Sequence, residues 1–224
     1  MLLFQITTTV DSLSQAGKEP ISLLELIMKG GFMMIPIFLF SILAVYIFIE
    51  RVLTINRASK TPDAFFDKIK ELVLKEDLSG ARLLCAQSDT PIARMIEKGI
   101  SRLGSQLKNI EASIENVGKI EIYKLEKNLS LLATTAGAAP MIGFLGTVTG
   151  MIRAFIAIAQ EEGTVSPKLL SSGIYEAMVT TAAGLIVGII AYLGYNYLVT
   201  RIQKLIYRME YTSINFVDLL QEPR

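Results

Sequence analysis

Residues 169–199 read LLSSGIYEAMVTTAAGLIVGIIAYLGYNYLV, and Glu176 is the only charged residue in this run. As a helix, the run is long enough to cross about 30 Å of hydrocarbon. A lone ionised carboxyl at membrane depth costs roughly 2.5 kcal/mol or more. Chains do not usually carry that cost for packing, so Glu176 is predicted to be a proton or ion site whose carboxyl is neutral part of the time.

Two further apolar runs lie upstream. Gly30 to Ile49 contains no charge, and residues 129–159 contain Arg153 alone. Both runs are long enough to span a bilayer. We therefore predict an all-α integral membrane protein with three transmembrane helices, the second and third extended into a helical cytoplasmic domain. The predicted segments are an N-terminal periplasmic tail (1–29), the first span (30–50), a cytoplasmic helical segment (51–128), the second span (129–159), a periplasmic connector (160–168), the third span (169–199) and a cytoplasmic C-terminal helix (200–224).

The composition excludes several classes of function. The chain has 224 residues, of which 51% are hydrophobic, no histidine, and one cysteine. Without histidine there is no Ser-His-Asp triad and no supply of the commonest metal ligand. No phosphate-binding glycine motif is present, and no basic run with interleaved aromatic residues points to nucleic acid. We expect neither an enzyme nor a metal or cofactor site, with protons as the coupling ion.

The distribution of Lys and Arg predicts the orientation. Residues 50–128 hold fourteen of the 22 basic residues, whereas the connector 160–168 holds Lys168 alone. Cytoplasmic loops carry the excess of basic residues. The large segment and the C-terminus are therefore expected in the cytoplasm, and the N-terminus outside.

The cytoplasmic segment carries helix signals. Thr61-Pro62-Asp63 and Thr90-Pro91 each offer an N-cap followed by proline. Ser79 or Gly80 is expected to break the chain before the next helix. From about Gln106 the helical pattern is expected to run without interruption into the second span, and the C-terminal residues are expected to extend the third span.

Small residues favour close contact between the second and third spans. Within a membrane, glycines let helices approach closely and pack by van der Waals contact. Two spans alone leave many small faces unpaired, which predicts a homo-oligomer. The predicted packing positions are Gly143, Gly146 and Gly150 in the second span and Gly184 and Gly188 in the third.

Three threonines accompany the carboxyl. If the connector turns near residues 161–162, Thr147 lies at the depth of Glu176, and Thr180 is one turn from Glu176 on the same helix. With Thr181, these hydroxyls could form a sparse proton wire. The alternative is that each threonine bonds the carbonyl four residues earlier. Glu176 could instead form a structural ion pair with Arg153 or Lys168, although Arg153 is expected to extend towards the outer interface.

These residues also carry a family resemblance. The second span contains APMIGFLGTVTGM (139–151) followed by FIAIAQ (155–160), and the third contains GIYEAMVTTAAGL (173–185). With one span and a large basic segment ahead of them, these motifs resemble the ExbB/TolQ branch of the ExbB/TolQ/MotA proton-channel family. The resemblance covers about residues 20–205. Thr149 and Arg153 depart from the family pattern.

The resemblance implies functional assignments beyond the residue patterns. By motif, Thr147, Glu176 and Thr181 match the proton path of the family. The family fold implies a ring of five chains in the bacterial inner membrane, around an ExbD/TolR-like single-span partner. Proton flow would then do work on an energy transducer such as TonB or TolA. An ExbB-like role in TonB-dependent transport, a TolQ-like role in envelope maintenance and a structural scaffold remain open, and a small secondary transporter is the weakest alternative.

Overall fold

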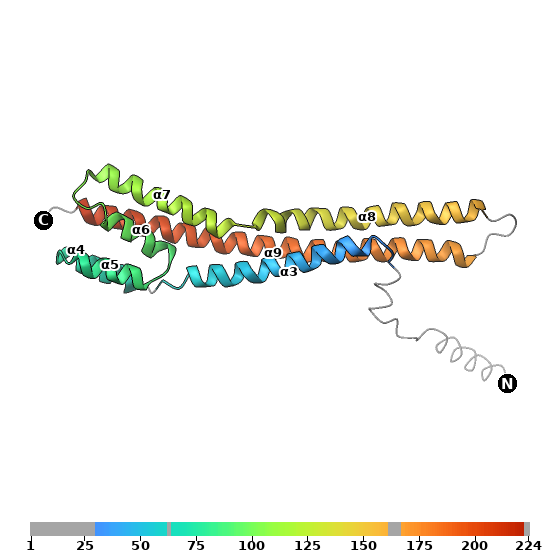
Figure 1. Cartoon of the computed structure of the whole chain (residues 1–224), viewed down its shortest axis with the longest axis horizontal. Helices are drawn as coiled ribbons and strands as arrows, with labels where there is room; N and C mark the ends of the chain where they lie inside the picture. Colours follow the sequence, from blue (N-terminus) through green and yellow to red (C-terminus); the bar gives the residue numbers. More distant parts are fainter. Residues whose placement is uncertain (1–29, 62–63, 161–166, 222–224) are drawn as a thin grey trace, which may run out of the picture. The chain divides into compact units, whose positions relative to one another are not determined.

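The computed structural model describes residues 30–61, 64–160 and 167–221, with the backbone alone for 167–170. Every regular element in these residues is an α-helix (Figure 1). The all-α prediction is therefore confirmed for the described part of the chain. The helices are α3 (Met34–Ala58), α4 (Ala64–Leu74), α5 (Leu78–Gln87), α6 (Pro91–Ile100), α7 (Leu107–Glu126), α8 (Leu129–Gln160) and α9 (Pro167–Gln221).

Three regions are long and apolar enough to cross a membrane, which agrees with the sequence. They are Met34–Ala58, a stretch within Leu107–Gln160 and a stretch within Ser171–Gln221. The first helix begins four residues later than the predicted span and continues to Ala58, because nothing after Ile49 stops a helix. The C-terminal extension of the third span is confirmed, since α9 runs through 55 residues without a break.

The second span does not continue directly from the helix before it, so that prediction was wrong. Helix α7 ends at Glu126 and α8 begins at Leu129. Between them Asn128 has φ +63°, a left-handed conformation that asparagine adopts more readily than most residues. The break removes the usual helical donors of the last α7 carbonyls. Arg51 of α3 replaces them, donating through Nη1 to Lys124 O at 2.9 Å and Leu125 O at 3.4 Å.

The caps of the short helices partly match the sequence. Thr90 caps α6 and accepts from Ala93 N at 3.4 Å, with Pro91 at the first turn, as predicted. The predicted break at Ser79 or Gly80 was wrong, because Asp77 caps α5 by accepting from Gly80 N at 2.9 Å. Of the predicted cap at Thr61-Pro62-Asp63, Pro62 and Asp63 lie outside the described residues.

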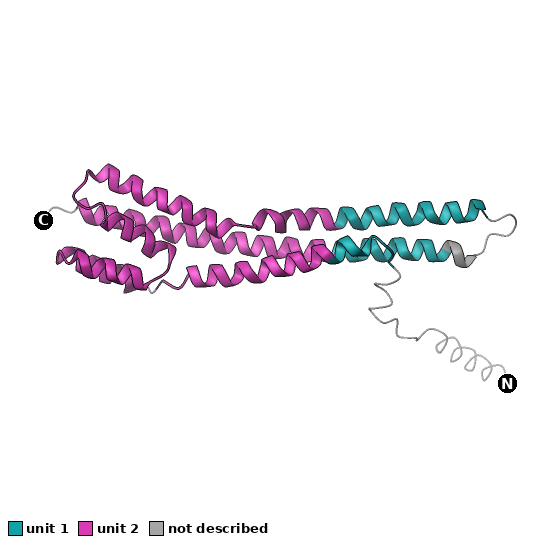
Figure 2. Cartoon of the chain, in the orientation of Figure 1, with its two compact units in different colours: residues 1–38, 140–185 teal, residues 39–139, 186–224 magenta. Residues whose placement is uncertain are grey.

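The chain divides into two compact units, coloured separately in Figure 2. Unit 1 comprises residues 1–38 and 140–185, and unit 2 comprises residues 39–139 and 186–224. In unit 2, one hydrophobic core contains buried side chains from each helix from α3 through α7, from the first residues of α8 and from the C-terminal part of α9. Its fully buried side chains include Ile47, Ile69, Ile96, Ile114 and Phe216.

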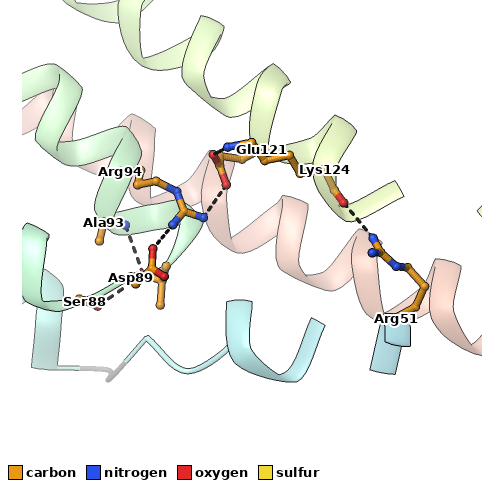
Figure 3. Close-up of polar contacts among 8 residues, drawn as sticks. Arg51, Ser88, Asp89, Ala93, Arg94, Glu121 and Lys124 are labelled. Atoms are coloured by element: carbon orange, nitrogen blue, oxygen red, sulfur yellow. Dashed lines mark hydrogen bonds and ion pairs between the residues drawn. The ribbon is translucent and has the colours of Figure 1, made fainter. Parts of the chain in front are cut away.

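Unit 2 also contains a buried polar cluster (Figure 3). The Glu121 side chain is only 4% exposed and accepts from Arg94 at 2.6 Å and from Lys124 at 2.7 Å. Arg94 also pairs with Asp89. Burial alone raises the pKa of Glu121, but the hydrogen bonds from Arg94 and Lys124 outweigh burial, so its pKa is lower than usual. Glu121 and Arg51 are therefore charged residues of this segment that lie in the interior of unit 2.

Candidate functional site

In unit 1, α8 and α9 pack through glycines. A Cβ added at Gly143 would stand 2.9 Å from Thr180 O and 3.2 Å from the Cα of Gly184. One at Gly150 would stand 3.1 Å from the Cβ of Ala177. A Cβ added at Gly146 would overlap the Thr180 hydroxyl and stand 2.7 Å from the Thr180 Cβ. Any larger side chain at these positions would push the two helices apart.

The remaining predicted packing glycine is Gly188 of α9, which lies in unit 2 and is buried. Gly184, in unit 1, is buried as well. Their burial is compatible with the packing role expected from the second GxxxG pair.

The hydroxyls of Thr147 and Thr181 meet between the helices. Thr181 donates to Gly143 O at 2.9 Å, and the Thr147 hydroxyl contacts both the Thr181 hydroxyl and Ala177 O, the latter at 3.2 Å. Each hydroxyl has one proton and also has a backbone carbonyl within reach, so either threonine can be the donor in the hydroxyl pair. These bonds cross between helices, so bonding to the carbonyl four residues earlier does not describe Thr147 or Thr181.

Thr180 behaves differently. Its hydroxyl bonds the backbone carbonyls of Glu176 at 3.2 Å and Ala177 at 2.9 Å, within its own helix. Its side chain is buried against Gly146. The local alternative therefore describes Thr180, and within the described residues no hydrogen bond joins its hydroxyl to the Glu176 carboxyl.

The Glu176 carboxyl is held by two other elements of unit 1. Arg153 Nη1 of α8 donates to Glu176 Oε1 at 3.1 Å, with side chains 57% and 27% exposed respectively. Gly31, in the turn before α3, lies against the same carboxyl: an added Cβ would overlap Oε1 and stand 2.6 Å from Cδ. Gly31 also has φ +65°, which favours glycine. Arg153 was expected to extend towards the outer interface, and instead it contacts Glu176.

The register of the helix pair differs from the sequence estimate. Thr147 was expected at the depth of Glu176, but its hydroxyl meets α9 at Ala177 and Thr181. Thr147 thus contacts α9 up to about one helical turn further along the chain than predicted. The connector residues 161–166, whose turn sets this register, lie outside the described part of the chain.

The arrangement combines one ionisable carboxyl with a pair of hydroxyls in an apolar helix pair. A carboxyl can take up and release a proton, and hydroxyls can relay one because each both donates and accepts. Among the described residues, no group of three His, Cys, Asp or Glu side chains could hold a metal ion. Sequence reasoning missed the contact with Gly31, for which the only signal was the Gly30-Gly31 pair ahead of the first span.

Known proteins show which family this chain is related to. Residues 87–211 match the MotA/TolQ/ExbB proton channel family. A putative biopolymer transport protein, ExbB-like 1 of Synechocystis, is 32% identical over 181 residues, covering 80% of this chain and 71% of the relative. The biopolymer transport protein ExbB of Aquifex aeolicus is 34% identical over 62% of this chain and 87% of its own. The Tol-Pal system protein TolQ of Haemophilus influenzae is 37% identical over 44% of this chain and 41% of its own.

Proposed function

Because the chain belongs to the MotA/TolQ/ExbB proton channel family, we propose that it is the proton-conducting subunit of an ExbB-like motor. In this proposal the motor couples the proton motive force across the inner membrane to work on a TonB-like envelope protein. The observation that carries the proposal is the placement of Glu176, the sole acidic residue of its apolar run, about a turn from the hydroxyl contact between Thr147 and Thr181.

In the proposed mechanism, Glu176 alternates between its protonated and ionised forms, or steers protons to a carboxyl on the partner helix. The Thr147–Thr181 pair passes the proton between α8 and α9. Moving one charge through 100 mV supplies about 2.3 kcal/mol, so substantial work requires several protons per cycle. The small-residue faces of the spans favour a homo-oligomer, and the family match favours a pentamer around an ExbD/TolR-like partner. The N-terminus would be periplasmic and the C-terminus cytoplasmic.

The test is proton flux through the reconstituted complex. The chain is co-expressed with an ExbD/TolR-like single-span partner, and flux driven by a pH gradient is measured for the wild type, Glu176→Gln and Glu111→Gln. The last variant makes the same chemical change at an exposed position of α7. We expect flux to be lost in Glu176→Gln with the oligomer intact, and kept in Glu111→Gln. Full flux in Glu176→Gln would refute the proposal.

A structural scaffold is the second candidate, and the ion pair between Arg153 and Glu176 favours it. In a scaffold the pair serves assembly, and Arg153→Ala should dissolve the folded oligomer by leaving a charge without its partner. In a motor the same variant should still assemble. Size-exclusion profiles of Arg153→Ala therefore separate the two. An ExbB-like role is distinguished from a TolQ-like one by whether TonB or TolA is co-purified with the complex.

A further inference from the structure

We propose that a basic cavity in unit 2, at the C-terminal end of α3, binds the phosphate headgroup of an anionic phospholipid. Such binding goes beyond the motor function and does not depend on proton conduction. Three features carry the inference: the charges that line the cavity, the apolar part of its wall, and its distance from the first membrane span.

Three cations line this cavity, whose volume is about 410 Å³. Arg57 lies in the last turn of α3, Lys60 follows two residues after the helix ends, and Lys68 lies on α4. Lys60 N donates to Arg57 O at 3.2 Å, which fixes the backbone between the first two. Like charges that lie close together repel each other, and a bound anion would offset that repulsion.

The described carboxylates nearby do not neutralise these cations. None of the three cations forms an ion pair with a described residue. The one described carboxylate in the lining, Asp89, pairs with Arg94 (Figure 3). Asp67 of α4 lines a different cavity, and Asp63 lies outside the described residues. Even if Asp63 and Asp67 are counted against the three cations, the charge around the cavity remains positive.

The rest of the lining favours a phospholipid headgroup over a free phosphate ion. The buried Phe65 and the half-buried Leu84 form an apolar part of the wall, and Ser88 contributes a hydroxyl that can donate to a phosphate oxygen. A free phosphate ion would gain nothing from the apolar surface. The glycerol and the first methylenes of a phospholipid would be removed from water against it.

The cavity lies close to the level expected for lipid headgroups. Arg57 is eight residues beyond Ile49, the last residue of the charge-free run, which corresponds to about 12 Å along α3. The headgroup layer extends about 5–8 Å beyond the hydrocarbon on each side. Side chains on a helix tilt towards its N-terminus, which for α3 is the membrane side. The long side chain of Arg57 can therefore bring its guanidinium to the phosphates, as arginines at membrane interfaces do.

The test measures the affinity of the purified full chain for phosphatidylglycerol in detergent by native mass spectrometry. Lys60→Gln/Lys68→Gln removes two charges at exposed positions, and Lys60→Arg/Lys68→Arg keeps them. The matched control, Lys70→Gln/Lys108→Gln, removes two charges at exposed positions outside the lining. We expect the affinity to fall about thirtyfold in Lys60→Gln/Lys68→Gln, because each basic residue beside an anionic lipid contributes about a factor of five. The other two variants should bind as the wild type does.

Two further probes identify the source of the phosphate. Phosphatidylcholine, which carries the same phosphate without a net charge, should bind more weakly than phosphatidylglycerol, and millimolar inorganic phosphate should not displace the lipid. Unchanged affinity in Lys60→Gln/Lys68→Gln, or an equal loss in the control variant, would overturn the site. Displacement by inorganic phosphate would overturn the lipid assignment and identify a site for free phosphate.

Discussion

Gly143 is the position at which the contact between α8 and α9 can be tested most sharply, by its replacement with alanine. An added Cβ would stand 2.9 Å from Thr180 O and 3.2 Å from the Cα atoms of Thr181 and Gly184. All three are backbone atoms, so no flexible side chain can move aside. Ordinary contact needs about 0.5 Å more space, and α8 and α9 must separate to provide it.

The matched control is Gly137→Ala on the same helix, where an added Cβ meets nothing within 4 Å. Both substitutions gain up to about 1 kcal/mol of helix propensity. Comparing the two variants therefore cancels that gain and leaves the steric cost. Inserting a methyl group into a packed interface costs typically 1–3 kcal/mol, so Gly143→Ala should be less stable than Gly137→Ala by about that amount.

The assay is thermal unfolding of the purified complex, followed by size exclusion after heating. Each kcal/mol should lower the melting temperature by roughly 2–4 °C for a chain of this size. Flux should fall as well, because Thr181 donates to Gly143 O and the separation stretches that bond. If Gly143→Ala had the same melting temperature as Gly137→Ala and a normal proton flux, the close packing of α8 on α9 would be refuted.

Two further predictions concern unit 2. The pKa of Glu121 is lower than usual, so the ionised carboxyl stabilises the fold above the unfolded-state pKa of about 4.3, and this stabilisation is lost as the pH falls through the folded-state pKa. Glu121→Gln should therefore have a lower melting temperature than the wild type at pH 7. A difference in melting temperature that persisted at pH 3 would contradict the assignment. Burial, with a smaller contribution from Glu97, raises the pKa of the Cys85 thiol to about 12. A maleimide at pH 8 should therefore modify Cys85 on the order of a thousandfold more slowly than a free cysteine until denaturant is added. Rapid modification of the native chain, measured by mass spectrometry, would show that Cys85 is not buried on α5.

The sequence predicted those parts of the fold that depend on interactions and burial within a single segment. A charge-free run such as 30–49 has few alternatives to spanning a bilayer, because burying charge in hydrocarbon is expensive. Thr90-Pro91 marked a helix start because the cap and the fixed φ of proline act within one turn. Nothing stops a helix between residues 199 and 221, and α9 continues through them.

The structural features that were not predicted depend on residues that lie far apart in the sequence. The break between α7 and α8 is satisfied by Arg51, 73 residues before the carbonyl that it bonds at Lys124. Asn128 was the one local signal, and asparagine alone does not distinguish a break from a helical position. Glu121 is buried only because Arg94 and Lys124 reach it. No periodicity of a single segment encodes such pairings.

The candidate site shows the same division. Glu176 could be identified because a carboxyl in an apolar run is costly wherever it points. The sequence could not show which of Thr180 and Thr181 contacts α8, because this depends on the rotation of α9 against α8. On a helical wheel Thr180 is closer to Glu176, yet its hydroxyl bonds its own helix, whereas Thr181 meets Thr147.

The distribution of charge between the two units bears on how one carboxyl could serve a motor. In unit 2, Glu121 has two cationic partners and is held ionised, so it cannot exchange protons near neutral pH. Among the described residues of unit 1, Glu176 has one cationic partner, Arg153, which contacts a single carboxylate oxygen. A group that must both bind and release a proton needs a partner strong enough to orient it and too weak to keep it permanently ionised. In the proposed motor, Glu176 is therefore the carboxyl with fewer cations to hold it, one at a single oxygen against two at Glu121.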